Sequence, residues 1–113
     1  MKLELKHLAP YLPYGLRIFN KDNKSSYVLS TGSIDRVTEL PEIFKPILRP
    51  LSDLTERASK VMSGLSLNTF IKKINNQDLS YITFNELISL HFDVFGLIEE
   101  GLAIDINTLS NEN

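Results

Sequence analysis

The sequence predicts an α+β fold, in which a small antiparallel sheet from the N-terminal half packs against two or three C-terminal helices, with the option of a final strand. Two observations favour this class. Apolar residues alternate with a period near two between Leu16 and Pro50 and recur with a period near 3.6 after Pro50. The chain has 113 residues, 42% of them hydrophobic, which is enough for one core. We therefore expect residues 1–113 to form a single domain.

The chain opens with a short helix and a hairpin. Apolar residues at positions 5, 8, 9 and 12 have helical spacing, but Pro10 and Pro13 limit the helix to about one turn. The apolar segments 16–19 and 26–31 flank the polar run 20–24. This pattern is typical of two strands joined by a hairpin turn.

Two further extended segments are expected before the helices begin. One lies within Ser33–Leu40, and the other covers Phe44–Arg49. Pro46 lacks the N–H group that a central strand needs, so we expect this last segment at a sheet edge or outside the sheet.

Two amphipathic helices follow Pro50. The first has an apolar stripe formed by Leu54, Ala58, Val61 and Met62. It has a capping box at residues 53 and 56 and a glycine at position 64 to end it. The second runs over Leu67–Ile74 after a cap at residue 66.

A third helix of about four turns is predicted to begin at Thr83, which has capping-box spacing to Glu86. One face carries His91 together with the apolar residues 84, 87, 88, 95 and 98. Phe92 and Leu97 lie off this stripe and belong either to the core or to the seam of a homodimer. Glycine 101 ends the helix, a half-buried strand follows over 102–107, and residues 109–113 form a frayed tail.

The charges are unevenly distributed along the chain. Ten of the twelve basic residues precede residue 61, and no lysine or arginine occurs from Ile74 onward. The formal net charge of −2 therefore combines a basic first half with an acidic second half. The absence of cysteine excludes disulfides and thiolate sites. With no long apolar run and no secretory pattern at its start, the chain is expected in the cytosol and not in a membrane.

No pattern of residues predicts catalysis, a metal or a cofactor. His91 and Asp93 are two positions apart, so on a helix their side chains diverge by about 200° and cannot share an ion. No nucleophile elbow, phosphate-binding loop or dinucleotide fingerprint is present. We therefore expect a protein that is not an enzyme and binds no cofactor, with His91 buried among apolar residues.

Two charged sets remain as candidate contact residues. The carboxylates Asp93, Glu99, Glu100 and Asp105 are the candidate partner-binding site. The alternative is a basic surface for nucleic acid, with Arg49, Lys72 and Lys73 as its contacts.

Three stretches resemble small uncharacterised proteins encoded by bacterial phages and prophages. They are Lys6–Leu16 (KHLAPYLPYGL), Lys45–Leu54 (KPILRPLSDL) and His91–Asn107 (HFDVFGLIEEGLAIDIN). The resemblance implies a phage accessory protein acting in the host bacterial cytoplasm. Its sharpest form is an anti-CRISPR inhibitor whose partner is an RNA-guided nuclease effector, a ribonucleoprotein with a positively charged channel. The alternatives are a phage nucleic-acid-binding or regulatory protein and a small virion or packaging component.

Overall fold

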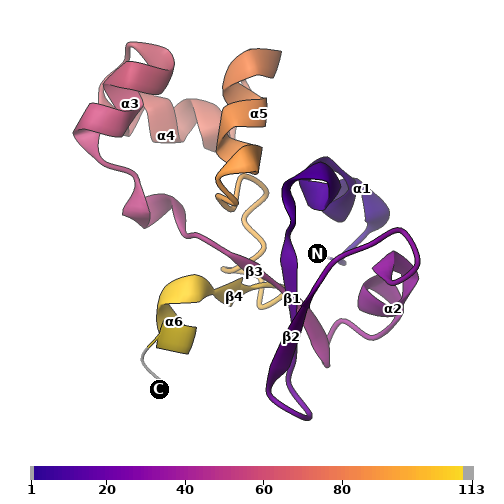
Figure 1. Cartoon of the computed structure of the whole chain (residues 1–113). Helices are drawn as coiled ribbons and strands as arrows, with labels where there is room; N and C mark the ends of the chain where they lie inside the picture. Colours follow the sequence, from indigo (N-terminus) through magenta and orange to yellow (C-terminus); the bar gives the residue numbers. More distant parts are fainter. Residues whose placement is uncertain (1, 111–113) are drawn as a thin grey trace.

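The computed structural model describes residues 2–110 and confirms the α+β class (Figure 1). A four-stranded sheet has the strand order β2-β1-β3-β4. Its strands are β1 (Arg17–Asn20), β2 (Ser25–Val28), β3 (Phe44–Leu48) and β4 (Ile104–Asp105). The α-helices are α1 (Leu5–Leu8), α2 (Ile34–Glu39), α3 (Glu56–Ser63), α4 (Leu67–Asn75), α5 (Tyr81–Ser89) and α6 (Ile106–Ser110), and the 3₁₀-helices are η1 (Ala9–Tyr14) and η2 (Leu51–Asp53).

Five of the six α-helices lie in two groups around the sheet, whereas α6 lies apart from both, next to β4. In Figure 1, α3, α4 and α5 gather at the upper left, whereas α1 and α2 lie to the right of the strands. The expected short first helix is present as α1, and it continues into η1. Because η1 also contacts α5, the N-terminal segment links the two groups.

The sheet begins with the predicted hairpin and is mixed. Strand β1 pairs antiparallel with both β2 and β3, and β4 pairs parallel with β3. The final strand is therefore present, but it is two residues long where six were expected. The segment 109–113 was expected as a tail; its first two residues belong to α6, and Asn111–Asn113 lie outside the described residues.

Two expectations for the first half are wrong. The segment Ser33–Leu40 contains the helix α2, with Ile34 and Val37 buried, instead of a strand. Strand β3 lies between β1 and β4, so Pro46 is not at an edge. Lys21 N–H donates to Ile43 O (2.9 Å), and hydrogen-bonded pairs alternate along an antiparallel ladder. Pro46 lies opposite Ile18 in a pair that is not hydrogen-bonded, so its backbone nitrogen points away from β1. On the other side, β4 pairs only with Ile47 and Leu48, so the missing N–H of Pro46 interrupts neither ladder.

The helix starts differ from the predicted ones in two of three cases. Ser66 caps α4 as expected, because its hydroxyl accepts the Thr69 N–H. Thr55, one residue before α3, replaces the predicted capping box there, and Ser80 replaces Thr83 as the cap of α5. The true cap residues have extended backbone and a hydroxyl within reach of the N–H three residues on.

Helix α5 ends at Ser89, about three turns before the predicted end at Gly101. His91 has φ 66°, in the left-handed region. The Phe92 N–H donates to Leu87 O (3.0 Å) and the His91 N–H to Ile88 O (2.9 Å), which is the Schellman arrangement with His91 at the position that glycine usually occupies. Leu87 and Phe92 are both buried and supply the hydrophobic contact that accompanies this motif.

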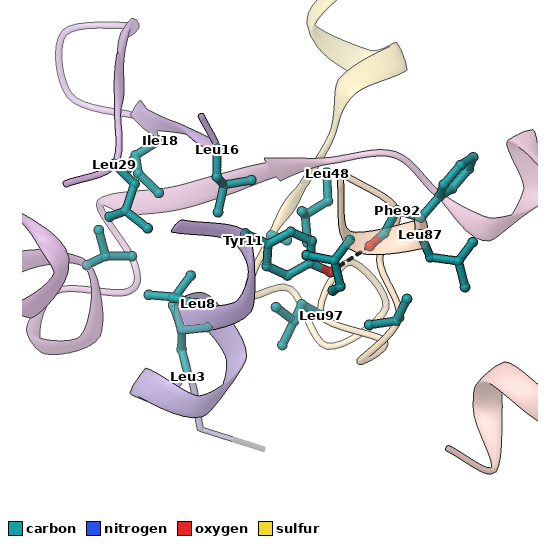
Figure 2. Packing of buried hydrophobic residues seen from close by; sticks show 14 of the residues in the cluster. Leu3, Leu8, Tyr11, Leu16, Ile18, Leu29, Leu48, Leu87, Phe92 and Leu97 are labelled. Carbon is teal, nitrogen blue, oxygen red and sulfur yellow. Dashed lines mark hydrogen bonds between the residues drawn. The ribbon is translucent and has the colours of Figure 1, made fainter. Parts of the chain in front are cut away.

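The buried residues form one cluster that joins the sheet to both groups of helices (Figure 2). It includes Leu3 and Leu8 from the start of the chain, Ile18 and Leu48 from the sheet, and Phe70 from α4. Phe92 and Leu97 are also fully packed in it. Of the two alternatives left open for this pair, the core is therefore correct and the homodimer seam is not.

Candidate partner-binding site

Asp93 does not belong to an exposed acidic surface, contrary to the sequence-based expectation. The residue is 5% exposed. One carboxylate oxygen accepts the Leu97 N–H (2.8 Å) and the other accepts the Ile98 N–H (2.9 Å). Burial raises the pKa of Asp93, although these backbone bonds oppose the shift. Asp93 therefore anchors the turn that follows it.

That turn carries the two exposed glutamates, Glu99 and Glu100. Gly101 has φ 75° and ends the turn, where Leu102 N–H donates to Leu97 O (2.9 Å). The fourth predicted carboxylate, Asp105, lies in β4 and accepts the Asn107 N–H (2.8 Å). The predicted acidic site is thus reduced to a pair of glutamates on a turn whose geometry Asp93 fixes.

The basic alternative consists of three residues with different surroundings. The guanidinium of Arg49 stacks on the Phe92 ring at 4.3 Å, next to the end of β3. Lys73 forms an ion pair with Asp78 (3.3 Å), and Lys72 is exposed on α4. Within residues 2–110, no hydrogen bond or ring contact joins Arg49 to either lysine.

His91 is half-buried and is not sealed inside a helix face, so that prediction is also wrong. Its Nε2 lies 2.7 Å from Tyr14 O, which ties the end of α5 to η1. Its backbone oxygen accepts the Arg49 N–H (2.8 Å), and Asp93 N–H donates to Arg49 O (2.9 Å). These contacts give His91 a structural role, because it joins the end of α5 both to η1 and to the segment after β3.

An apolar groove of about 350 Å³ lies where the end of α4, the start of α5 and the segment 94–95 meet. We call it the aromatic groove, and it is lined by Ile74, Gln77, Leu79, Tyr81, Phe84, Val94 and Phe95. Phe95 is held edge-to-face by Phe84 (6.1 Å between centroids), Tyr11 (6.4 Å) and His7 (5.4 Å). These ring contacts fix one wall of the groove before any partner arrives.

Local backbone chemistry places the groove residues. Helix α4 ends in a Schellman arrangement with Gln77 at φ 55°, where Asp78 N–H donates to Lys73 O (2.9 Å). Three residues later, the Ser80 hydroxyl accepts the Thr83 N–H (3.2 Å) and starts α5. The tight connection puts Tyr81 and Phe84 opposite the end of α4.

The rim of the aromatic groove exposes large apolar side chains. Tyr81 is 77% exposed, and its neighbour Ile82 is 75% exposed. Apolar side chains exposed beside a groove are typical of a surface that binds another protein. Sequence reasoning missed this surface because the apolar stripe was started at Phe84, which left Tyr81 and Ile82 without a role. That surplus of apolar residues was the signal that could have found it.

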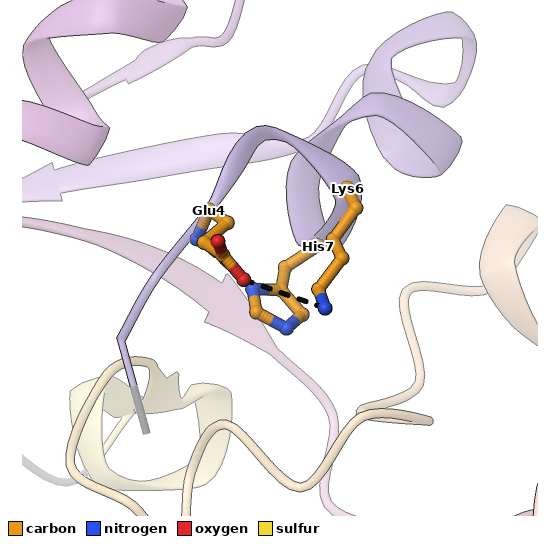
Figure 3. A network of polar contacts seen from close by, with 3 residues as sticks. All are labelled: Glu4, Lys6 and His7. Atoms are coloured by element: carbon orange, nitrogen blue, oxygen red, sulfur yellow. Dashed lines mark hydrogen bonds and ion pairs between the residues drawn. The ribbon is translucent and has the colours of Figure 1, made fainter.

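A second pocket adjoins the aromatic groove and shares Gln77 and Phe95 with it. We call it the His7 pocket, and its other lining residues are Lys2, Glu4, Lys6 and His7. Figure 3 shows Glu4, Lys6 and His7 together at the start of α1. Glu4 N–H donates to His7 Nδ1 (3.0 Å), and the Glu4 carboxylate pairs with Lys6 (3.4 Å).

The described part of the chain provides no metal site and no membrane span. Within residues 2–110, no three histidine, aspartate or glutamate side chains lie close enough together to hold a metal ion. None of the helices in the same range is long and apolar enough to cross a bilayer. Comparisons with known protein families, with curated proteins and with solved structures gave no match.

Proposed function

We propose that this chain is a phage-encoded accessory protein, not an enzyme, that binds and inhibits a macromolecule of its bacterial host. Its sharpest form is inhibition of an RNA-guided nuclease effector in the host cytoplasm. The identification as a phage protein rests on the resemblance of Lys6–Leu16, Lys45–Leu54 and His91–Asn107 to phage and prophage proteins. The structural support is the exposed apolar rim of the aromatic groove.

The argument for a protein partner rests on Tyr81. Its ring lines the aromatic groove, yet more than three quarters of the residue remains exposed. Tyrosine at the edge of a preformed apolar pocket is a frequent energetic centre of protein interfaces, since it offers contact area with few rotatable bonds. Because ring contacts already order Phe84 and Phe95, binding there would lose little side-chain entropy.

The acidic turn has a secondary part in this proposal. Glu99 and Glu100 are exposed on a turn that buried Asp93 holds in place. Such a pair can dock on a basic flank of a ribonucleoprotein and speed the encounter with it. Two carboxylates cannot mimic a nucleic acid strand, so the apolar groove supplies most of the binding energy.

The test is a phage-plating assay in bacteria that carry an active RNA-guided nuclease system directed against the phage. Expression of the chain should restore plating, and Tyr81→Ser should reduce that rescue by about tenfold or more, as expected for loss of a central interface residue. Val61→Ser is the matched control, because Val61 is 81% exposed on α3 and does not line the groove.

Two results would contradict the proposal. One is a chain that never restores plating against a panel of nuclease effectors. The other is tight binding of the purified chain to RNA or DNA with no effector present, lost in Lys72→Ala and steeply salt-dependent, which would favour the nucleic-acid alternative.

A further inference from the structure

The aromatic groove and the His7 pocket form one continuous surface with two kinds of chemistry. They share Gln77 and Phe95, so a bound segment can reach both. The groove side is apolar, with Leu79, Tyr81 and Phe84 along it. The His7 pocket, on the other side of Gln77 and Phe95, is lined by polar and charged residues. A segment that fills both must carry a large apolar group beside a polar one.

The hydrogen bond from Glu4 determines which nitrogen of His7 carries the proton. Glu4 N–H can only donate, so Nδ1 of His7 must accept it (3.0 Å). Burial and the nearby Lys6 charge lower the pKa of His7, with Glu4 opposing them, so the ring is neutral at pH 7. In a neutral imidazole the remaining nitrogen then holds the hydrogen. His7 therefore presents Nε2–H as a fixed donor.

This donor has no partner in the described part of the chain. The His7 residue is only 6% exposed, yet its unpartnered Nε2 is not one of the fully buried side-chain atoms that lack a hydrogen-bond partner, a set that in the described residues contains only the Tyr27 hydroxyl. The small accessible part of the ring therefore includes Nε2–H, and His7 lines the pocket. A donor that is nearly buried and has no protein acceptor favours an acceptor supplied from outside.

The charges around the donor favour an anionic acceptor. Lys2 and Lys6 both line the His7 pocket, against one carboxylate, that of Glu4. Glu4 is already paired with Lys6 at 3.4 Å. With His7 neutral, the lining has a formal charge of +1, and the Lys2 ammonium forms no ion pair within residues 2–110. A carboxylate that accepted the Nε2–H would also meet this positive charge.

We propose that the joined surface binds a segment of a partner protein in which an aspartate or glutamate is adjacent to a large apolar residue. The apolar side chain fills the aromatic groove against Phe84 and Phe95. The carboxylate accepts the His7 Nε2–H beside Lys2 and Lys6. This inference rests on the proposed function in assuming a protein partner, and it adds the chemistry that the partner must offer.

The probes are two capped peptides that differ in one group, acetyl-Gly-Phe-Asp-Gly-amide and acetyl-Gly-Phe-Asn-Gly-amide. Binding to the full chain is followed by NMR titration of the backbone amides. The aspartate peptide should bind about tenfold more tightly, which is the ratio expected for one charge-assisted hydrogen bond. The shifted amides should cluster at residues 4–7, 77–84 and 94–95.

Variants of the chain assign the preference to the donor and the charge. His7→Phe keeps a ring against Phe95 but removes the Nε2–H, so the preference for aspartate should disappear while the asparagine peptide binds as before. Since His7→Phe also removes the acceptor of the Glu4 N–H, Lys2→Met gives a second test that leaves this bond intact. It should reduce the preference several-fold.

Three results would overturn the inference. They are equal affinity for the two peptides, a preference that survives both variants, or tighter binding of acetyl-Gly-Gly-Phe with a free C-terminal carboxylate than of the internal aspartate peptide. Loss of plating rescue in Tyr81→Ser, found together with equal peptide affinities, would remove this inference and leave the proposed function standing.

Discussion

Replacing Asp93 by alanine should strongly destabilise the chain, although the change removes a charged group from the interior. The carboxylate accepts two backbone N–H groups, those of Leu97 and Ile98, at 2.8 and 2.9 Å. Leu97 is completely buried, so its N–H has no route to water when the acceptor is gone. Alanine would leave both donors unpaired.

The size of the effect follows from two opposing contributions. Each buried donor without an acceptor costs roughly 1–3 kcal/mol. The second donor, on Ile98, is only partly buried and belongs at the lower end of that range. Removing the carboxylate also relieves the desolvation that raises its pKa. We expect a net loss of about 2–4 kcal/mol in the free energy of unfolding, or a fall of about 8–17 °C in Tm for a domain of this length.

Urea unfolding followed by circular dichroism measures this loss, with Tm as a second readout. Asp93→Asn keeps the shape but presents an amide NH₂ to one donor, so it should lose about 1–2 kcal/mol. Glu99→Ala is the matched control, since Glu99 is an exposed carboxylate in the same turn, and its Tm should change by no more than about 2 °C. A change equally small in Asp93→Ala would refute the role given to this carboxylate.

Three further predictions concern stability. Burial raises the pKa of Asp93 in the folded state, so between pH 3.8 and the folded pKa the folded chain binds more protons than the unfolded chain. The free energy of unfolding of the wild type, relative to Asp93→Asn, should therefore fall as the pH rises through this window and stay constant above it. Urea unfolding across the window measures this fall. Tyr11→Phe removes the hydroxyl that donates to Phe92 O (2.5 Å) and should lower the free energy of unfolding by about 1–2 kcal/mol in the same assay. Ser80→Ala should cost about 1 kcal/mol by removing the cap of α5, whereas Thr83→Ala should cost less; the reverse order of Tm values would restore Thr83 as the cap.

The parts of the fold that could be predicted from sequence are those with a local signal. The hairpin, the cap at Ser66 and the glycine end at Gly64 each depend on residues within a few positions of one another. Gly64 has the left-handed backbone that its position predicts, with φ 74°.

The end of α5 could not be predicted because its apolar pattern continues beyond the helix. His91 occupies a left-handed position that glycine would normally mark. Its ring contact with Tyr14 O, 77 residues away in sequence, stabilises that conformation and depends on the tertiary fold. Once the helix stops at Ser89, the alternation of faces expected for residues 91–100 no longer applies.

In the candidate site, too, only the features with a local sequence signal could be predicted. Glu99 and Glu100 are exposed as expected, because adjacent charges near a chain turn are rarely buried. Asp93 was misplaced, since only the tertiary turn supplies the N–H groups that allow its burial. The aromatic groove combines residues from α4, α5 and segment 94–95, and no local pattern reports such a combination.

Hydrogen exchange of the chain bound to its partner tests most directly whether the aromatic groove is the contact surface. A partner recovered with the wild-type chain, and lost with Tyr81→Ser, would be examined by comparing amide exchange in the free and bound chain. We predict slower exchange at residues 77–84 and 94–95, with little change around Val61 on α3. Protection confined to the turn at Glu99 and Glu100, with the groove unchanged, would contradict the account.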